Sequence, residues 1–549
     1  MKAFIRILAL AVMAIGNIVI VGCSKNQDVQ QQPQSQFSYS EYTIQLGEQL
    51  YNPYLLQTMQ TALEELVREG GARLQVPELA VTHLYVRFLP ETKEDLEALW
   101  NLGEELYLYP LDYEIKQWGL YYKDPFLGED DYPYVYAVVP ADFVFPQVRH
   151  DVLAQCYIPN LTDDDVEGTS VSGCELEWKA FEPLYLKSET KSGISAGVGN
   201  TISPNGSVTV DTCKGNFVPL RGAKVRCRTL LREAEAVLSD EGTYSFNEDE
   251  YFVVEPTYSI VYTNEKGFSL WYNLLAGASD ACVDVDSQAI DGFNIKFSLS
   301  GNSQADSVNF ALAAVNNSVC DYLDMCKAEG ILPPPEDLKI WVMSFLGSSS
   351  ASMIRRVAEL GDEEIRVLLE KLVDFASRET DLTEIIDKEV VVPILQELLK
   401  LCEGLLPDLT IGANTGDYSY GRFYSVTWHE LTHSSHFSLV GPEVWKTYIY
   451  YILDYGCYGD GSAPEEKRGI CDLGESWAYA NEHYCGKQFG RIKDPCSRLE
   501  WFFKHYQQLD KILNSGKMTR GQMYWHLKKA DGQPCLTFNE YLDELNEKN

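Results

Sequence analysis

The spacing of apolar residues between positions 38 and 195 predicts alternating helices and strands. Apolar side chains recur every three or four residues from Gly47 to Glu69 and from Glu91 to Glu105, which predicts two amphipathic helices. Runs rich in β-branched and aromatic residues at 81–88 and 134–139 predict strands. We therefore expect an N-terminal α/β domain over residues 38–195.

The pattern becomes β-rich after position 195. Residues 196–295 carry short apolar runs separated by turn residues and show little helical periodicity. These runs predict a middle domain made of strands, the clearest at 206–210, 219–225 and 239–246.

Helical periodicity returns from 296 to 549 and predicts a mainly helical C-terminal domain. One short strand is expected within it, because apolar residues alternate over 407–414, a segment that ends in Gly and Asn. The fold class we predict is therefore a multidomain α+β protein. The helices expected in the C-terminal domain cover residues 362–378, 382–402, 496–515 and 521–529.

The first 23 residues have the pattern of a targeting segment and not of a folded element. Lys2 and Arg6 form a positive start, and residues 7–21 form a short apolar run. Residues 20–23, Ile-Val-Gly-Cys, resemble a bacterial lipobox, which implies that Cys23 carries lipid. The run is short for a membrane-spanning helix and ends at this cysteine.

A lipidated Cys23 predicts a protein that is attached to a membrane through its N-terminal lipid anchor. Residues 24–37 are polar and rich in Gln, as expected of a flexible tether. We expect an outer-membrane or cell-surface lipoprotein of the cell envelope. The alternatives are a plain signal peptide and a single spanning helix.

The composition argues against one class of partner. The formal net charge is −36, so phosphate backbones would be repelled and nucleic acid is not expected as a partner.

Fourteen cysteines include Cys23, and the other thirteen are an odd number that cannot all pair within the chain. None has C-x-x-C spacing, which argues against a structural zinc–thiolate site.

The chemistry is concentrated in the H-E-x-x-H segment His429-Glu430-Leu431-Thr432-His433. Side chains four apart lie on one face of a helix, so both imidazoles can reach a single metal ion. Glu430 follows the first imidazole and can act as a general base on a water molecule. Ser425 or Thr427 is expected to cap this helix, and Gly441-Pro442 to end it before a second helix over 443–454.

A catalytic zinc site needs a third protein ligand. His436 lies seven residues after His429, about 10 Å along a helix, which is too far to share the metal. The metzincin spacing would require a glycine at His436 and a histidine at Leu439, so that class is excluded. His436 is instead expected to support the site or to face the substrate.

Glu475, in Gly474-Glu475-Ser476-Trp477-Ala478-Tyr479, lies 42 residues after His433 at the start of another predicted helix. Here the chain resembles the gluzincins, whose third zinc ligand is a glutamate on a later helix. The two segments together resemble a group of secreted lipoprotein metallopeptidases from Bacteroidetes, over roughly residues 405–490. The resemblance implies a Zn²⁺ cofactor held by His429, His433 and Glu475, with Glu430 as base.

The chain departs from thermolysin-like gluzincins at one position. Those enzymes carry an aspartate four residues after the third ligand, where this chain has Tyr479. Tyr479 lies one turn from Glu475 and is a candidate hydrogen-bond donor to the oxyanion of the reaction, although a packed aromatic fits equally well. Glu482, seven residues after Glu475, is the alternative third ligand.

Two further expectations concern the parts around the motif. The P-L-x-G-x-x-V run at 219–225 and the D-x-G-x-Y turn at 240–244 resemble the carboxypeptidase regulatory-like β-sandwich, which implies a structural or adhesive middle domain. The strand at 407–414 is either an edge strand that pairs with an extended substrate or an ordinary core strand.

These features predict a zinc-dependent peptidase, most simply an endopeptidase, that acts on protein or peptide substrates in the cell envelope. The alternative is a non-catalytic surface lipoprotein that binds glycan or peptide on a relic zincin fold. The intact Glu430 favours the enzyme. A zinc hydrolase of non-peptide amides would use the same residues.

Overall fold

The computed structural model describes most of the chain after residue 43. The targeting segment 1–23 with Cys23, the tether 24–37 and the helix predicted at 382–402 lie outside the described residues. The described residues are 44–70, 76–100, 104–117, 124–128, 131–161, 165–186, 204–246, 256–272, 280–283, 294–298, 304–343, 349–358, 365–371, 407–413, 419–455, 470–489 and 505–547, with Leu102, Tyr122, Gly292, Gly361 and Glu363.

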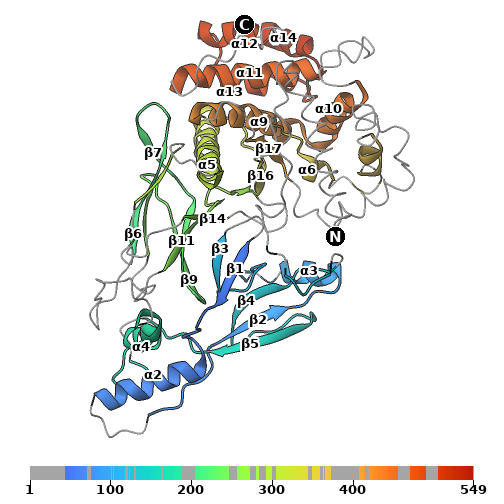
Figure 1. The fold of residues 1–549 in the computed structure, drawn as a ribbon. Coiled ribbons are helices and arrows are strands. Elements are labelled where there is room, and N and C mark those ends of the chain that lie inside the picture. Colours follow the sequence, from blue (N-terminus) through green and yellow to red (C-terminus); the bar gives the residue numbers. More distant parts are fainter. Residues whose placement is uncertain are drawn as a thin grey trace.

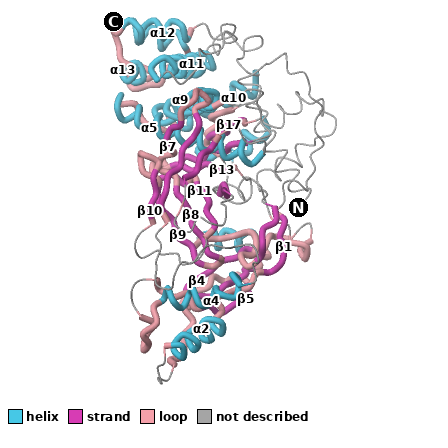
Figure 2. The backbone as a smooth tube through the Cα atoms, turned by 60° about the vertical axis from the view of Figure 1, so that its left-hand side comes forward, coloured by secondary structure: helices cyan, strands magenta, loops and turns pink. Residues whose placement is uncertain are grey.

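The protein is a mixed α and β structure with several separate sheets. Figures 1 and 2 show the N-terminal elements at one end, the strands of the middle part next to them, and the C-terminal helices at the other end. None of the described helices is both long enough and apolar enough to cross a membrane.

The N-terminal part combines helices with two small antiparallel sheets, of order β4-β2-β5 and β1-β3. The predicted strands at 81–88 and 134–139 are confirmed as β2 and β4. The helix predicted from Gly47 begins later, because 45–49 pair as a strand and Pro53 cannot lie inside a helix. The elements are β1 (Gln45–Gln49), α2 (Leu56–Glu69), β2 (His83–Phe88), α3 (Lys93–Trp100), β3 (Tyr113–Gln117), β4 (Val135–Pro140), β5 (His150–Cys156) and α4 (Gly173–Leu186).

The middle part contains two four-stranded sheets, β14-β11-β8-β9 and β10-β6-β15 with β7 on β6. The β-rich run at 219–225 ends β7, turns, and begins β8. The resemblance implies a hairpin here, but β7 pairs with β6, and β8 pairs with β9 and β11. Gly222 lies in this turn at φ 67°, and a Cβ would meet the Asn264 side chain at 2.6 Å, so only glycine fits. The strands are β6 (Asn205–Asp211), β7 (Phe217–Pro219), β8 (Lys224–Thr229), β9 (Arg232–Val237), β10 (Thr243–Ser245), β11 (Thr257–Val261), β14 (Asp280–Val283) and β15 (Asn294–Phe297).

A further sheet crosses the domain boundary predicted at 295/296. Its order is β12-β13-β16-β17, and β13 pairs in parallel with β16 although about 70 residues separate them in sequence. One hydrophobic core also extends from the middle strands into the C-terminal helices. The strands of this sheet are β12 (Thr263–Asn264), β13 (Phe268–Trp271), β16 (Leu338–Met343) and β17 (Leu409–Gly412).

Helices cover the rest of the C-terminal part, as predicted. Residues 365–371 are helical, and the helices expected at 443–454 and 496–515 correspond to α10 and α12 in the described chain. The helix expected at 521–529 ends at Trp525 in α13, because the chain turns there and Lys528 bridges Pro534. The helices are α5 (Gln304–Glu329), α6 (Ile354–Ala358), α9 (Tyr420–Val440), α10 (Pro442–Tyr455), α11 (Ile470–Phe489), α12 (Tyr506–Ser515), α13 (Arg520–Trp525) and α14 (Phe538–Glu547).

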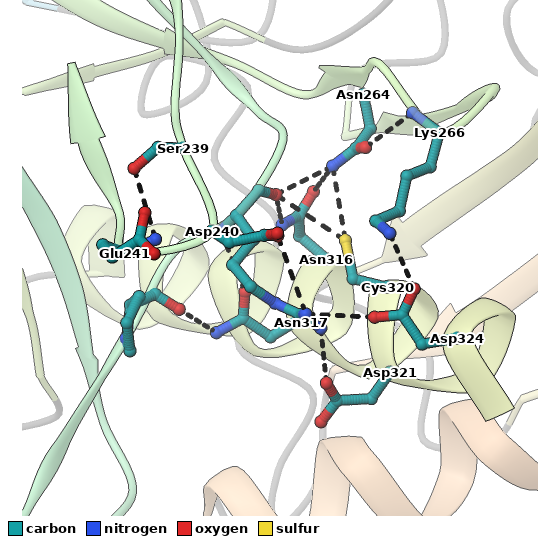
Figure 3. Close-up of polar contacts among 12 residues, drawn as sticks. Ser239, Asp240, Glu241, Asn264, Lys266, Asn316, Asn317, Cys320, Asp321 and Asp324 are labelled. Carbon is teal, nitrogen blue, oxygen red and sulfur yellow. Dashed lines mark hydrogen bonds and ion pairs between the residues drawn. The ribbon is translucent and has the colours of Figure 1, made fainter. Parts of the chain in front are cut away.

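Polar contacts join the middle strands to α5, the helix packed against α9 (Figure 3). The guanidinium of Arg221 binds the carboxylates of Asp321 and Asp324, and Lys266 binds Asp324 at 2.7 Å. Buried Asn264 donates to the side chain of Asn316 at 2.9 Å. Helix α5 also contacts α9, the helix that carries the H-E-x-x-H motif. The network therefore connects the middle strands, through α5, to the motif helix.

Cys320 and Cys326 are close in sequence, but both are free thiols and do not pair with each other. Both lie on α5, where residues six apart point in different directions. The Cys320 thiol lies 3.6 Å from the carbonyl of Arg221, whereas the Cys326 thiol lies 3.9 Å from the Ser435 hydroxyl.

Asp408 is a fully buried carboxylate immediately before β17. It binds Nη2 of Arg355 at 2.6 Å and Nε of Arg356 at 3.3 Å, and it accepts a hydrogen bond from the backbone of Lys339. These contacts hold the start of α6 against the sheet that lies beside the motif helix.

We expect Asp408→Ala to lower the free energy of unfolding by about 3 kcal/mol, because it leaves two largely buried guanidinium groups without their counter-charge. Urea unfolding of the full chain measures this loss. Glu363→Ala removes a carboxylate from an exposed Arg366 pair and serves as the control with little expected change. Equal stability of the two variants would contradict the role given to Asp408.

Candidate metal centre

The helix that carries the motif is longer than predicted. It begins at Tyr420 after the N-cap Ser419, whose side chain accepts a hydrogen bond from the backbone of Arg422. Ser425 and Thr427 therefore lie inside the helix, and the prediction that either caps it is wrong. The aromatic residues before the motif are compatible with a helix and are buried in the core. The predicted end at Gly441 is confirmed, with φ 82° at that glycine.

Nearly all side chains of α9 are buried, with an aromatic stack on one face and the two motif histidines on another. Tyr424 and Trp428 stack on each other, and Tyr322 of α5 packs against Trp428. His429 and His433 project from another face towards α11, which contacts α9 along its length. The aromatic stack thus sets the rotation of α9 that aims both imidazoles at α11.

The structure brings together the three ligands predicted from the sequence. The Nε2 atoms of His429 and His433 are 3.2 Å apart, and Glu475 Oε2 lies 3.2 Å from Nε2 of His429. Glu475 Oε1 lies 3.5 Å from Nε2 of His433. Tetrahedral zinc with bonds of about 2.0–2.2 Å would hold its ligand atoms about 3.3–3.6 Å apart. The spacing of these donors therefore fits a zinc ion.

Glu475 lies on the second turn of α11 and is buried. Burial opposes its ionisation, but His433 and His429 outweigh that effect and hold the pKa of the Glu475 carboxyl below its usual range. Tyr448 of α10 donates its hydroxyl to Oε1 at 2.9 Å, which leaves Oε2 facing His429. Burial lowers the pKa of His433, which favours the neutral imidazole that a metal requires.

Glu430 lies beside the three ligands and is only 2 % exposed. Burial raises the pKa of its carboxyl to about 8, and the nearby carboxylates of Glu475 and Glu482 act in the same direction. The backbone N–H of Ala351 donates a hydrogen bond to Glu430. Glu430 is therefore held next to the donor cluster by a neighbouring segment of chain.

That segment, residues 349–353, also decides the role of the strand predicted at 407–414. The strand is confirmed as β17, but β16 pairs with one side of it and Ser350 with the other. Ser350 and Thr410 exchange two backbone hydrogen bonds of 2.8 Å. Of the two alternatives for this strand, the structure therefore favours the core strand over the free substrate edge, because the Ser350 segment pairs with that edge.

Glu482 does not join the three ligands. Its Oε2 lies 3.2 Å from Nδ1 of His429, on the side of the ring opposite to the donor cluster. Its Oε1 accepts a hydrogen bond from the hydroxyl of Ser425. The alternative assignment of Glu482 as third ligand does not fit this geometry.

Tyr479 and His436 lie next to the cluster without entering it. The ring of Tyr479 packs on His429 with centroids 4.5 Å apart, so the packed-aromatic interpretation describes its contact, and its role as a donor stays a prediction. His436 is buried against Trp445, and burial lowers the pKa of its imidazole to about 3. His436 is therefore a neutral side chain, and the prediction that it cannot share the metal agrees with its position outside the cluster.

The sequence pattern does not identify two residues that contact the cluster or its neighbour. Tyr448 donates to Glu475, and Ser425 donates to Glu482, which lies beside the cluster. A hydroxyl on α10 that faces Glu475 is recognisable only after α10 has been packed against α11, which no local pattern reveals.

A second acidic group among the described residues, Glu105, Glu233 and Glu235, has a different explanation. Arg226 forms ion pairs with all three carboxylates, so this group is neutralised by protein cations.

No family model, curated protein or solved structure matches this chain in comparisons with known proteins.

Proposed function

We propose that this protein is a zinc-dependent peptidase, an endopeptidase in the simplest form, that hydrolyses proteins or peptides in the cell envelope. The observation that carries the proposal is the buried set of His429, His433 and Glu475, whose donor atoms have the spacing of tetrahedral zinc ligands, beside the carboxylate of Glu430. Three protein ligands leave a fourth position for water or substrate, as in catalytic zinc sites.

A zinc ion held by His429, His433 and Glu475 would supply a Lewis acid that makes water acidic near neutral pH. Glu430 accepts the proton of the attacking water and then passes it to the leaving amine. Burial alone favours the protonated form of Glu430, and a zinc ion at the three ligands would add positive charge that favours its carboxylate, the form that accepts a proton. We assign Tyr479 as the candidate donor to the oxyanion.

The proposed organisation follows the sequence prediction with one adjustment. A lipid on Cys23 would attach the protein to the outer membrane or cell surface, and residues 24–37 would tether it. Residues 38–195 would form an α/β domain and 196–295 a carboxypeptidase regulatory-like β-sandwich, ahead of a zincin-like catalytic domain. The adjustment is that strands at 263–271 belong to the sheet of the catalytic part.

Metal content and peptide cleavage test the proposal together. The full chain, extracted in detergent and purified without added metal, should contain one zinc per chain by mass spectrometry and should cleave members of a peptide library. Removal of the metal with 1,10-phenanthroline should abolish cleavage, and added zinc should restore it, because the protein residues alone do not acidify the water.

Each departure from this result has a defined meaning. Absence of zinc, even after zinc is supplied, would contradict the metal centre. Bound zinc without peptide cleavage would contradict the peptidase and favour either a zinc hydrolase of non-peptide amides or a surface lipoprotein that binds glycan or peptide on a relic zincin fold.

A further inference from the structure

The two imidazoles of the metal centre are supported unequally. His429 has a carboxylate partner on its Nδ1 atom, 3.2 Å away on Glu482. His433 has no hydrogen-bond partner for its Nδ1 atom among the described residues, and that atom is buried. Of the two ligand histidines, only His429 therefore has a described partner on Nδ1 that can fix the orientation and the tautomer of its ring.

Glu482 is well placed to exert that control. It lies on α11, two turns after Glu475, so both carboxylates face α9 from the same side of their helix. The side chain of Glu482 is buried, and Ser425 holds its second oxygen. Because Ser425 lies one turn before His429 on α9, the carboxylate is bound at two points of the helix that carries the imidazole.

We propose that Glu482 is the positioning residue of the metal centre. It keeps the proton of His429 on Nδ1 and thereby directs the lone pair of Nε2 towards the metal, while Ser425 locks Glu482 in place. A carboxylate on the outer nitrogen of a ligand histidine fixes the tautomer and raises the basicity of the ligand. This role deepens the proposed function and rests on it.

Zinc affinity, measured by competition with a chelator on the full chain, provides the first test. Glu482→Ala should weaken zinc binding about 10–100-fold, the usual loss for an outer partner of a ligand histidine. Glu482→Gln should recover most of the affinity, because an amide oxygen still accepts the Nδ1–H hydrogen bond. Ser425→Ala should cause a smaller loss, since it frees the carboxylate but leaves it present.

Asp472→Asn is the matched control. Asp472 is also a carboxylate of α11 that contacts a histidine, His505, but it lies outside the metal centre. The variant should leave zinc affinity unchanged. Equal affinities of Glu482→Ala and Asp472→Asn would overturn the proposal. A loss as large as that of Glu475→Ala would also overturn it, because Glu482 would then be a ligand.

The tautomer of His429 gives a readout that needs no metal. Nitrogen NMR of the metal-free, ¹⁵N-histidine-labelled protein should report a proton on Nδ1 of His429 in the wild type, whether or not Nε2 also donates to Glu475, and loss of that Nδ1 proton in Glu482→Ala. An unchanged tautomer in that variant would contradict the positioning role. If the wild type holds the Nδ1 tautomer but binds no zinc, the proposed function fails while the contact between Glu482 and His429 stands.

Discussion

Glu430→Gln is expected to lower kcat for peptide cleavage about 10²–10⁴-fold, the usual contribution of a general base, and to leave zinc bound. The glutamine side chain has nearly the same shape and still accepts the hydrogen bond from Ala351, so the fold around it is retained. It cannot take a proton at neutral pH. Because Glu430 is not among the three donors of the metal centre, zinc content should stay at the wild-type value.

Turnover of the peptide selected from the library and zinc content by mass spectrometry are measured on the same preparation. Glu443→Gln is the control, since Glu443 is an exposed carboxylate on α10 that pairs with Lys446. Its turnover should match the wild type. Undiminished turnover of Glu430→Gln would remove Glu430 from the mechanism, whereas loss of its zinc would show that Glu430 is a ligand.

Glu475→Ala loses zinc. The change removes one of three protein ligands and leaves two imidazoles. It also removes the carboxylate that accepts the hydrogen bond of the half-buried Tyr448 hydroxyl. We expect the loss of affinity to exceed the about 10–100-fold typical of outer partners, because a ligand contributes a bond to the metal itself. The chelator competition that measures Glu482→Ala measures this variant on the same scale.

The order of the zinc affinities distinguishes a ligand from a positioning residue. The expected order is wild type, then Glu482→Gln, then Glu482→Ala, with Glu475→Ala weakest. Wild-type affinity in Glu475→Ala would contradict the assignment of the third ligand. Thermal unfolding of the metal-free proteins is the control for the fold, because both glutamates are buried and a general loss of structure would lower every affinity.

The sequence by itself determined the local parts of the metal centre. The four-residue spacing of His429 and His433 places both imidazoles on one helix face because the helical period is 3.6 residues. Gly441 marks the end of that helix because it reaches positive φ without strain. The distance limit that excluded His436 also follows from helix geometry alone. These features depend on neighbours within two turns, and the structure places each of them as predicted.

The tertiary structure decided everything that depends on two elements together. Glu475 and Glu482 lie two turns apart on one face of α11, so their own helix does not distinguish a ligand from a positioning residue. The rotation and axial offset of α11 against α9 place Glu475 at Nε2 of His429 and Glu482 at Nδ1. Tyr448 reaches Glu475 for the same reason.

Tertiary structure also determines which strands share a sheet across the predicted domain boundary and which segment pairs with the edge of β17. Strand β13 pairs with β16 across about 70 residues, and Ser350 pairs with Thr410 across 60. Local periodicity identifies a strand by its alternating faces, but it does not name the partner that accepts its hydrogen bonds. Partner choice follows from burying one shared core, a property of the whole chain, and only the folded protein specifies it.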